Sequence, residues 1–187
     1  FGHGTEMAGI ALLGDLTPYL AHTDPVILNH RLESVKILPD NGENPPEHYG
    51  WITKESVHRA QVNAPFRQRV YCLAVTAGKA LNGKPDSWSS MIDQLAVAAD
   101  PEEQERERQL FFISVGNIRD EITHHTYPAM NDLEDVENPA QSWNAIAVGA
   151  LTEKSFADET DFADWTLVAP PGGLSPISRT SIGWLES

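Results

Sequence analysis

A histidine near the start of the chain lies where other backbone can approach its imidazole closely. His3 stands between Gly2 and Gly4, and Thr5 follows before a run of small and apolar residues. Glycines carry no side chain, so they leave room around the ring. The pattern predicts a loop that enters a tightly packed helix over residues 7–13, with Thr5 as its N-cap. The buried residues of this helix are expected to be Met7, Ala8, Ile10, Ala11 and Leu12.

Zinc chemistry has to be considered because the chain contains seven histidines. A catalytic zinc site needs ligands that can share one ion, such as the two histidines of His-Glu-x-x-His on a helix. That motif does not occur, and no second histidine follows His3 at helical spacing. His124 and His125 are adjacent, so their side chains point in different directions. The histidine pattern therefore predicts no metal site.

An asparagine follows an apolar run that is predicted to be a buried strand. Asn117 comes just after residues 110–115, with Gly116 between them. In open α/β sheets ligands bind outside the carboxyl ends of the strands, so Asn117 stands where a site belongs. The alternative is structural, because asparagine also makes left-handed turns after strands. The residues by themselves favour this structural interpretation.

Strand-like runs alternate with helix-like or loop-rich stretches along the chain. Strands are predicted over residues 34–38, 70–75, 110–115 and 145–148. Helices are predicted near residues 7–13, 53–62 and 87–99, with a mixed region around 101–109. Pro85 and Asp86 form a turn that feeds the third helix. Its apolar face is expected to hold Met91, Ile92, Leu95 and Ala96. This alternation predicts an α/β fold, with a parallel sheet covered by helices on both faces.

Composition limits the function classes that remain. The 187 residues suit one domain of ordinary size, and the net charge of −14 argues against nucleic acid as a partner. The sequence has no run of 18 apolar residues, so no membrane span is predicted. Cys72 is the single cysteine, which excludes a disulfide framework. The single cysteine and the absence of a visible signal peptide favour the cytoplasm.

Five stretches, in order, resemble the subtilisin-like serine peptidases (subtilases). Residues 3–9 are similar to the motif His-Gly-Thr-x-Val-Ala-Gly, with Met7 in place of valine. Residues 114–117 resemble Ser-Ala-Gly-Asn, with Val115 in place of alanine. Residues 145–150 resemble the strand Val-Ile-Ala-Val-Gly-Ala, and residues 35–38 with 49–52 resemble a strand and cleft loop. Residues 74–78 stand where the family carries Ser-Leu-Gly-Gly.

The resemblance implies a serine endopeptidase with a subtilisin-like fold and no metal or cofactor. His3 would take the proton of a serine hydroxyl that attacks the scissile carbonyl, and would return it to the leaving amine. The side-chain amide of Asn117 would stabilise the oxyanion, a contribution of roughly 3–4 kcal/mol. A peptide or protein substrate would lie along Val75, Thr76, Ala77 and Tyr49.

Two motifs of the family do not occur in the sequence. The resemblance places the catalytic aspartate in Asp-Ser-Gly or Asp-Thr-Gly upstream of His3, and the nucleophile in Gly-Thr-Ser-x-Ala downstream. Thr180 and Ser181 follow Arg179 and do not match the second motif. We therefore expect residues 1–187 to be the central part of a single subtilisin-like domain, excised from its parent and inactive alone. The alternative is a non-catalytic, peptide-binding fragment or a divergent homologue of the same fold.

The resemblance also implies a gap in the sheet. In subtilases the strand that ends in the catalytic aspartate lies between the strands that correspond to residues 34–38 and 70–75. We expect these two strands either to pair directly or to leave open edges through which copies self-associate. We also expect Asn117 and the start of the helix after His3 to lie at the same edge of the sheet.

Overall fold

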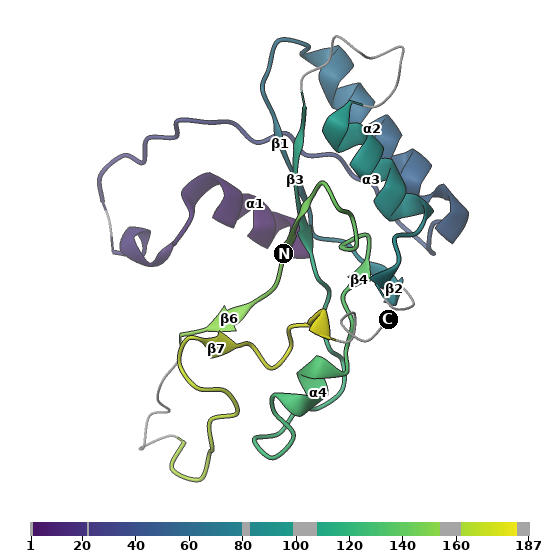
Figure 1. The fold of residues 1–187 in the computed structure, drawn as a ribbon. Coiled ribbons are helices and arrows are strands. Elements are labelled where there is room, and N and C mark those ends of the chain that lie inside the picture. The colour runs from purple at the N-terminus through teal and green to yellow at the C-terminus, as the bar shows by residue number, and fades with distance from the viewer. Residues whose placement is uncertain (1, 22, 80–82, 99–107, 154–161, 183–187) are drawn as a thin grey trace.

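The computed structural model describes residues 2–21, 23–79, 83–98, 108–153 and 162–182. A parallel three-stranded sheet is its centre, with β3 (Leu110–Ser114) between β1 (Val70–Leu73) and β5 (Ile146–Val148). Figure 1 shows this sheet between α1 and the pair formed by α2 and α3. The central strand is apolar, as a strand with two neighbours requires. The predicted α/β class and three of the four predicted strands are confirmed.

Helices α2 (Tyr49–Asn63) and α3 (Ser87–Val97) pack together and cover one face of the sheet. Asp86 begins α3 as its N-cap, because its carboxylate accepts a hydrogen bond of 2.8 Å from the backbone N–H of Ser89. The helices approach closely at Gly50, where an added Cβ would lie 3.2 Å from the Cβ of Met91. Trp88 donates its Nε1–H to Thr53 Oγ1 over 2.8 Å, so the buried indole has a partner. The apolar face predicted for α3 is confirmed for its buried residues Ile92, Leu95 and Ala96.

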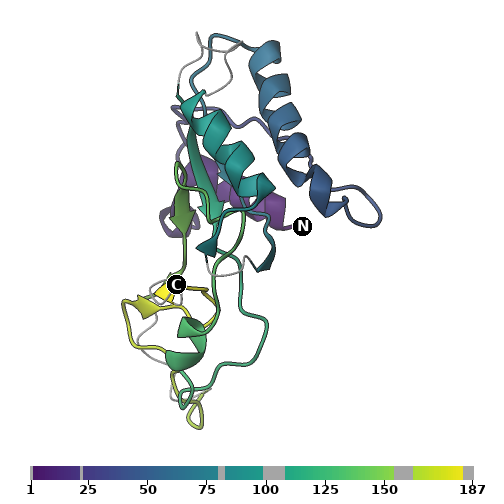
Figure 2. The same cartoon turned by 45° about the vertical axis from the view of Figure 1, so that its right-hand side comes forward.

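Helix α1 (His3–Leu13) differs from its prediction in two ways. It begins at His3, and its N-cap is Gly2, whose backbone is extended (φ −98°, ψ 162°). Thr5 already lies in the first turn and donates its backbone N–H to the carbonyl of Gly2 over 2.8 Å, so the predicted cap is wrong. The predicted buried face is also wrong, since no residue of α1 is buried. Figures 1 and 2 show α1 on the opposite side of the sheet from α2 and α3.

The strand predicted over residues 34–38 does not form. A strand needs a neighbour for its backbone groups, and in the described part of the chain β1 pairs with β3 alone. Direct pairing of residues 34–38 with residues 70–75 is therefore wrong. Val35 is 47% exposed and Leu38 is 51% exposed. Glu33 ties this irregular segment to the rest of the fold through ion pairs with Arg67 and Arg69.

The remaining short elements lie mostly at the carboxyl ends of the strands, the lower half of Figure 1. Strand β2 (Ala77–Lys79) pairs with β4 (Glu137–Asn138), and β6 (Leu151–Thr152) pairs with β7 (Gly173–Leu174), both antiparallel. Short helices complete the fold: η1 (Thr17–Tyr19), η2 (Pro46–His48) and α4 (Ala129–Asp132). Most of the mixed region predicted at residues 101–109 lies outside the described residues. Within the described ranges, no helix is both long enough and apolar enough to cross a membrane.

Candidate functional site

Asn117 lies beyond the carboxyl end of β3, where its backbone is fixed on both sides. The N–H of Val115 donates to the carbonyl of Val148 over 3.0 Å, which continues the pairing of β3 with β5. On the other side of Asn117, the N–H of Ile118 donates to the carbonyl of Ile177 over 2.8 Å. The side chain of Asn117 is exposed. The fold therefore presents an exposed side-chain amide, with no hydrogen-bond partner among the described residues, on a backbone that is held on both sides.

Gly116 explains how the chain reaches Asn117. Its φ of +88° lies in the left-handed region, which favours glycine. The carboxylate of Glu137 also fills the space beside it, since an added Cβ would lie 2.5 Å from Glu137 Oε2. That oxygen accepts a hydrogen bond of 2.6 Å from Thr76 Oγ1. Glu137 therefore links the loop that carries Asn117 to the segment that carries Thr76.

The three neighbouring residues predicted to bind substrate, Val75, Thr76 and Ala77, lie at the passage from β1 to β2. Ala77 begins β2 and pairs with Asn138, while Val75 and Ala77 pack against the apolar core. Within the described chain, the backbone N–H and C=O groups of Val75 and Thr76 have no hydrogen-bond partner. The structure thus brings the Thr76 segment and the Asn117 loop together through Glu137.

Tyr49 is the fourth residue predicted to bind substrate, and it lies elsewhere. It begins α2, and its ring centroid is 4.9 Å from that of Trp88 on α3. The ring is half-buried against the core. No contact described for Tyr49 joins it to Thr76 or Asn117.

His3 lies in the first turn of α1 with its side chain 68% exposed. Its Nδ1 is 3.7 Å from the carboxylate of Glu6, one turn along the helix. Among the described residues, no hydrogen bond or ion pair joins His3 to Asn117. A shared position of these two residues at one edge of the sheet therefore stays a prediction.

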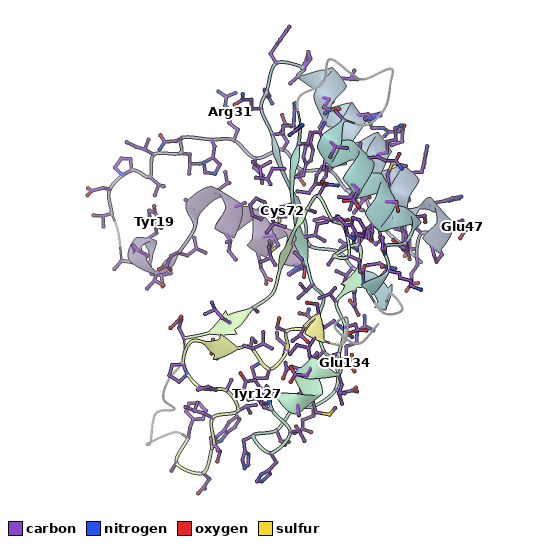
Figure 3. The ribbon with its side chains drawn as sticks, viewed as in Figure 1. Tyr19, Arg31, Glu47, Cys72, Tyr127 and Glu134 are labelled. Atoms are coloured by element: carbon purple, nitrogen blue, oxygen red, sulfur yellow. The ribbon has the colours of Figure 1, made fainter. Side chains whose placement is uncertain are left out.

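A buried arginine that the sequence did not point to lies behind the Asn117 loop. The side chain of Arg179 is 6% exposed, and its Nη1 donates to Glu134 Oε2 over 2.6 Å. Its Nη2 is 3.3 Å from Glu137 Oε1, and its Nε donates to the carbonyl of Asn117 over 3.1 Å. Glu134 follows α4 in the lower half of Figure 3. The residues after Gly173 show no helical or strand-like period, so the sequence offered no reason to single out Arg179. The one available signal was the acidic loop before Pro139, which would attract a cation.

Other reactive side chains offer little chemistry in this structure. The rings of His124 and His125 are exposed, and their centroids lie only 3.7 Å apart, so the prediction that these side chains point in different directions is wrong. In the ranges that the structure describes, no group of three or more His, Cys, Asp and Glu side chains could hold a metal ion. Partial burial raises the pKa of the Cys72 thiol. A raised pKa keeps the thiol protonated at neutral pH, which makes Cys72 a poor nucleophile.

One of three comparisons with known proteins found a matching family. The model of the Subtilase family matches residues 1–186. The match includes the His3 motif, the Thr76 segment and the Asn117 loop. A comparison with the curated proteins and one with the solved structures found no match.

Proposed function

Since the chain belongs to the subtilase family, we propose that the protein of which it is part is a serine endopeptidase. It hydrolyses peptide bonds through an Asp-His-Ser triad and an acyl-enzyme. The chain supplies the histidine, His3, and the oxyanion donor, Asn117. The 187 residues contain neither the motif that carries the catalytic aspartate in this family nor the motif that carries the catalytic serine. We therefore propose that these two residues lie outside this chain and that the chain alone is inactive.

The observation that carries this proposal is the state of Asn117. Its backbone is held by neighbours on both sides, while its side-chain amide is exposed and free to donate. A donor that is fixed before the reaction stabilises developing negative charge without having to reorganise. The amide also lies at the carboxyl end of a central strand, which is where ligands bind in open α/β sheets.

The Thr76 segment suits the binding of an extended peptide. A peptide that lies along a strand end gains affinity through hydrogen bonds between backbones. Among the described residues, the backbone groups of Val75 and Thr76 are unpaired. The side chain of Val75 packs against the core, and that of Thr76 donates to Glu137. Because Glu137 joins this segment to the Asn117 loop, a bound peptide would have its scissile carbonyl near the amide of Asn117. Tyr49 is proposed to line the cleft farther along.

The chemical steps follow from these roles. His3 accepts the proton of the serine hydroxyl while the serine oxygen attacks the carbonyl carbon of the substrate. The amide of Asn117 donates to the oxygen that gains the negative charge. The protonated His3 then gives its proton to the leaving amine, and the acyl-enzyme forms. Water enters, and His3 takes one of its protons while the water oxygen attacks the acyl carbon. The bond to the serine oxygen then breaks, His3 returns the proton to that oxygen, and the second product leaves as a carboxylic acid.

A second candidate is a peptide-binding protein of the same fold that does not cleave. The exposed side chain of His3, which contacts only Glu6 among charged residues of the described chain, favours this candidate. In that case Val75 and Thr76 would still bind an extended peptide, but no serine would be activated.

A fluorophosphonate probe separates the two candidates, because it labels only an activated serine. The protein at its natural length is expected to react with the probe and to cleave a peptide, and the 187-residue chain to do neither. Asn117→Ala is expected to lower kcat about 100- to 1,000-fold with little change in KM, the size known for such a donor in subtilisin. His3→Ala is expected to lower kcat by at least about 1,000-fold.

Asn144→Ala is the matched control, since Asn144 is another exposed asparagine, whose partner is Asp93 of α3. Its kcat is expected to stay within about twofold of the wild type, as for a surface change. A natural-length protein that binds peptides but neither reacts with the probe nor cleaves them would establish the second candidate instead.

A further inference from the structure

We infer that Arg179 is a positioning residue, which holds the Asn117 loop and the Thr76 segment in register with each other. This inference rests on the proposed function, because it concerns the same two binding segments. The side chain of Arg179 is buried, so we place it behind the binding segments and not in contact with substrate. It acts through the backbone of Asn117 and through the carboxylate of Glu137.

The first contact is direct. The Nε–H of Arg179 donates to the backbone carbonyl of Asn117 over 3.1 Å. The preceding residue, Ser178, forms an antiparallel bridge with Asn117. One segment therefore holds the backbone of Asn117 twice, by its own backbone and by the next side chain. Any shift of Arg179 would be passed to the residue that carries the amide.

The second contact runs through Glu137. One carboxylate oxygen of Glu137 lies 3.3 Å from Nη2 of Arg179, and the other accepts the hydrogen bond from Thr76. The same carboxylate is wedged against Gly116. Glu137 is therefore confined between three neighbours and transmits the position of the guanidinium to Thr76. A planar guanidinium suits this task, because it donates in several fixed directions at once.

The charges explain why a cation is required at this place. The side chains of Glu134 and Glu137 are both almost fully buried beside Arg179. Without the arginine, two carboxylates would remain close together with little water, and they would repel each other. Glu137 would then move away from Glu134, and Thr76 and Gly116 would lose their present position.

The segment that carries Arg179 is itself anchored. The Nδ2 of Asn131, a fully buried residue, lies 3.3, 3.0 and 2.9 Å from the carbonyl oxygens of Ser175, Pro176 and Ser178. The hydroxyl of Thr180 donates to the carbonyl of Asn131 over 3.1 Å. The backbone around Arg179 is therefore fixed by several hydrogen bonds, which a residue that positions others requires.

The experiment compares Arg179→Met and Arg179→Lys in the natural-length protein by steady-state cleavage of a peptide. Arg179→Met is expected to lower kcat at least about tenfold with KM changed less than about threefold, because the oxyanion donor is misplaced. Arg179→Lys is expected to recover part of the rate, since it restores the charge without the fork of donors. Arg69→Met is the matched control, because Arg69 is a similarly buried arginine (10% exposed) that pairs with Glu33 away from the site. Its kcat is expected to be unchanged at temperatures where it is folded.

A double mutant separates positioning from a general loss of stability. If Arg179 acts through Asn117, adding Arg179→Met to Asn117→Ala lowers kcat by less than about threefold more. If the two losses multiply, or if Arg179→Met alone keeps the wild-type kcat, the inference is wrong. Should Arg179→Met fail to fold, Arg179→Lys and Glu137→Gln carry the same cycle with the same criteria.

The failure of the inference and that of the proposed function look different. A normal kcat for Asn117→Ala overturns the proposed role of Asn117, and the inference falls with it. A strongly reduced kcat for Asn117→Ala, together with a normal kcat for Arg179→Met, overturns the inference alone.

Discussion

The two faces of the sheet are covered very differently, and two neighbouring residues of β3 show the contrast. Phe111 is 1% exposed, stacks on Tyr71 with ring centroids 4.8 Å apart, and belongs to the core under α2 and α3. Phe112 points to the other side, where its register partners are Cys72 and Ile146. On that side Cys72 and Ile146 remain exposed, although α1 lies there too. The same residue type in one strand is therefore fully buried on one face and half-buried on the other, according to what packs against it.

The largest expected effect comes from truncating these two side chains in turn. Phe111→Ala is expected to lower the free energy of unfolding by about 3–5 kcal/mol, because it leaves a cavity in a packed core. Phe112→Ala, the matched variant, is expected to cost less than half as much, because Phe112 is only half-buried. Urea unfolding of the 187-residue chain measures both values. Equal losses would show that both faces are covered in solution and would remove the contrast.

The open face suggests a second test, on association. We propose that copies of the 187-residue chain associate through the outer edges of β1 and β5, which pair with no other strand of the described chain, and through the apolar side chains beside them. Val70→Lys places a charge at the β1 edge, where Val70 is 64% exposed. It is expected to weaken association at least about tenfold, or about 1.4 kcal/mol, because lysine blocks edge pairing. Light scattering and sedimentation over a range of concentrations measure the change.

Val62→Lys is the control for association, because Val62 is also a strongly exposed valine (76%) but belongs to α2 and not to the sheet. It is expected to leave the dissociation constant unchanged. A wild-type chain that stays monomeric at every concentration would contradict the proposal.

The smallest expected effect concerns the segment around Glu33, before α2, which is held by ion pairs with Arg67 and Arg69 rather than by packing. Hydrogen bonds from Arg69 and then Arg67 lower the pKa of Glu33. A pKa that is lower in the folded state stabilises the fold above the unfolded pKa, and this contribution is lost as the pH falls through the folded value. Glu33→Gln is therefore expected to cost at most about 1 kcal/mol at pH 7, because the pair is partly exposed. Unfolding measured from pH 7 to pH 3 is expected to show this difference vanish at the acid end. A difference that persists there would mean that packing holds the segment.

The sequence predicts best where local rules and burial agree. The third helix combines a capping aspartate, a helical period and a complete apolar face, and α3 has all three. The strand before Asn117 is uniformly apolar and becomes the centre of the sheet. In contrast, residues 34–38 alternate like a strand but have no backbone partner among the described residues. Helix α1 has an apolar sequence but no core to enter. In both cases the sequence showed an apolar segment but not the element against which that segment would have to pack or pair.

The candidate site shows the same contrast between features set by local sequence and features that depend on distant residues. The position of Asn117 was predicted, because the end of an apolar strand can be read from a few residues. Arg179 was missed, because its contacts cross large distances along the chain. Its bond to Asn117 spans 62 residues, and that to Glu134 spans 45. No short pattern contains both ends of such a contact.

The tight contact between the carboxylate of Glu137 and Gly116 limits which substitutions this protein can accept. A side chain at position 116 would begin where the carboxylate of Glu137 now lies, and the backbone there is already left-handed. An alanine at 116 can be accommodated only if residue 137 becomes shorter and the turn relaxes. A shorter residue 137 would in turn leave Thr76 without its acceptor and Arg179 without one of its two carboxylate partners. Positions 76, 116, 137 and 179 are therefore expected to change as a set in related sequences, and single substitutions at one of them to be rare.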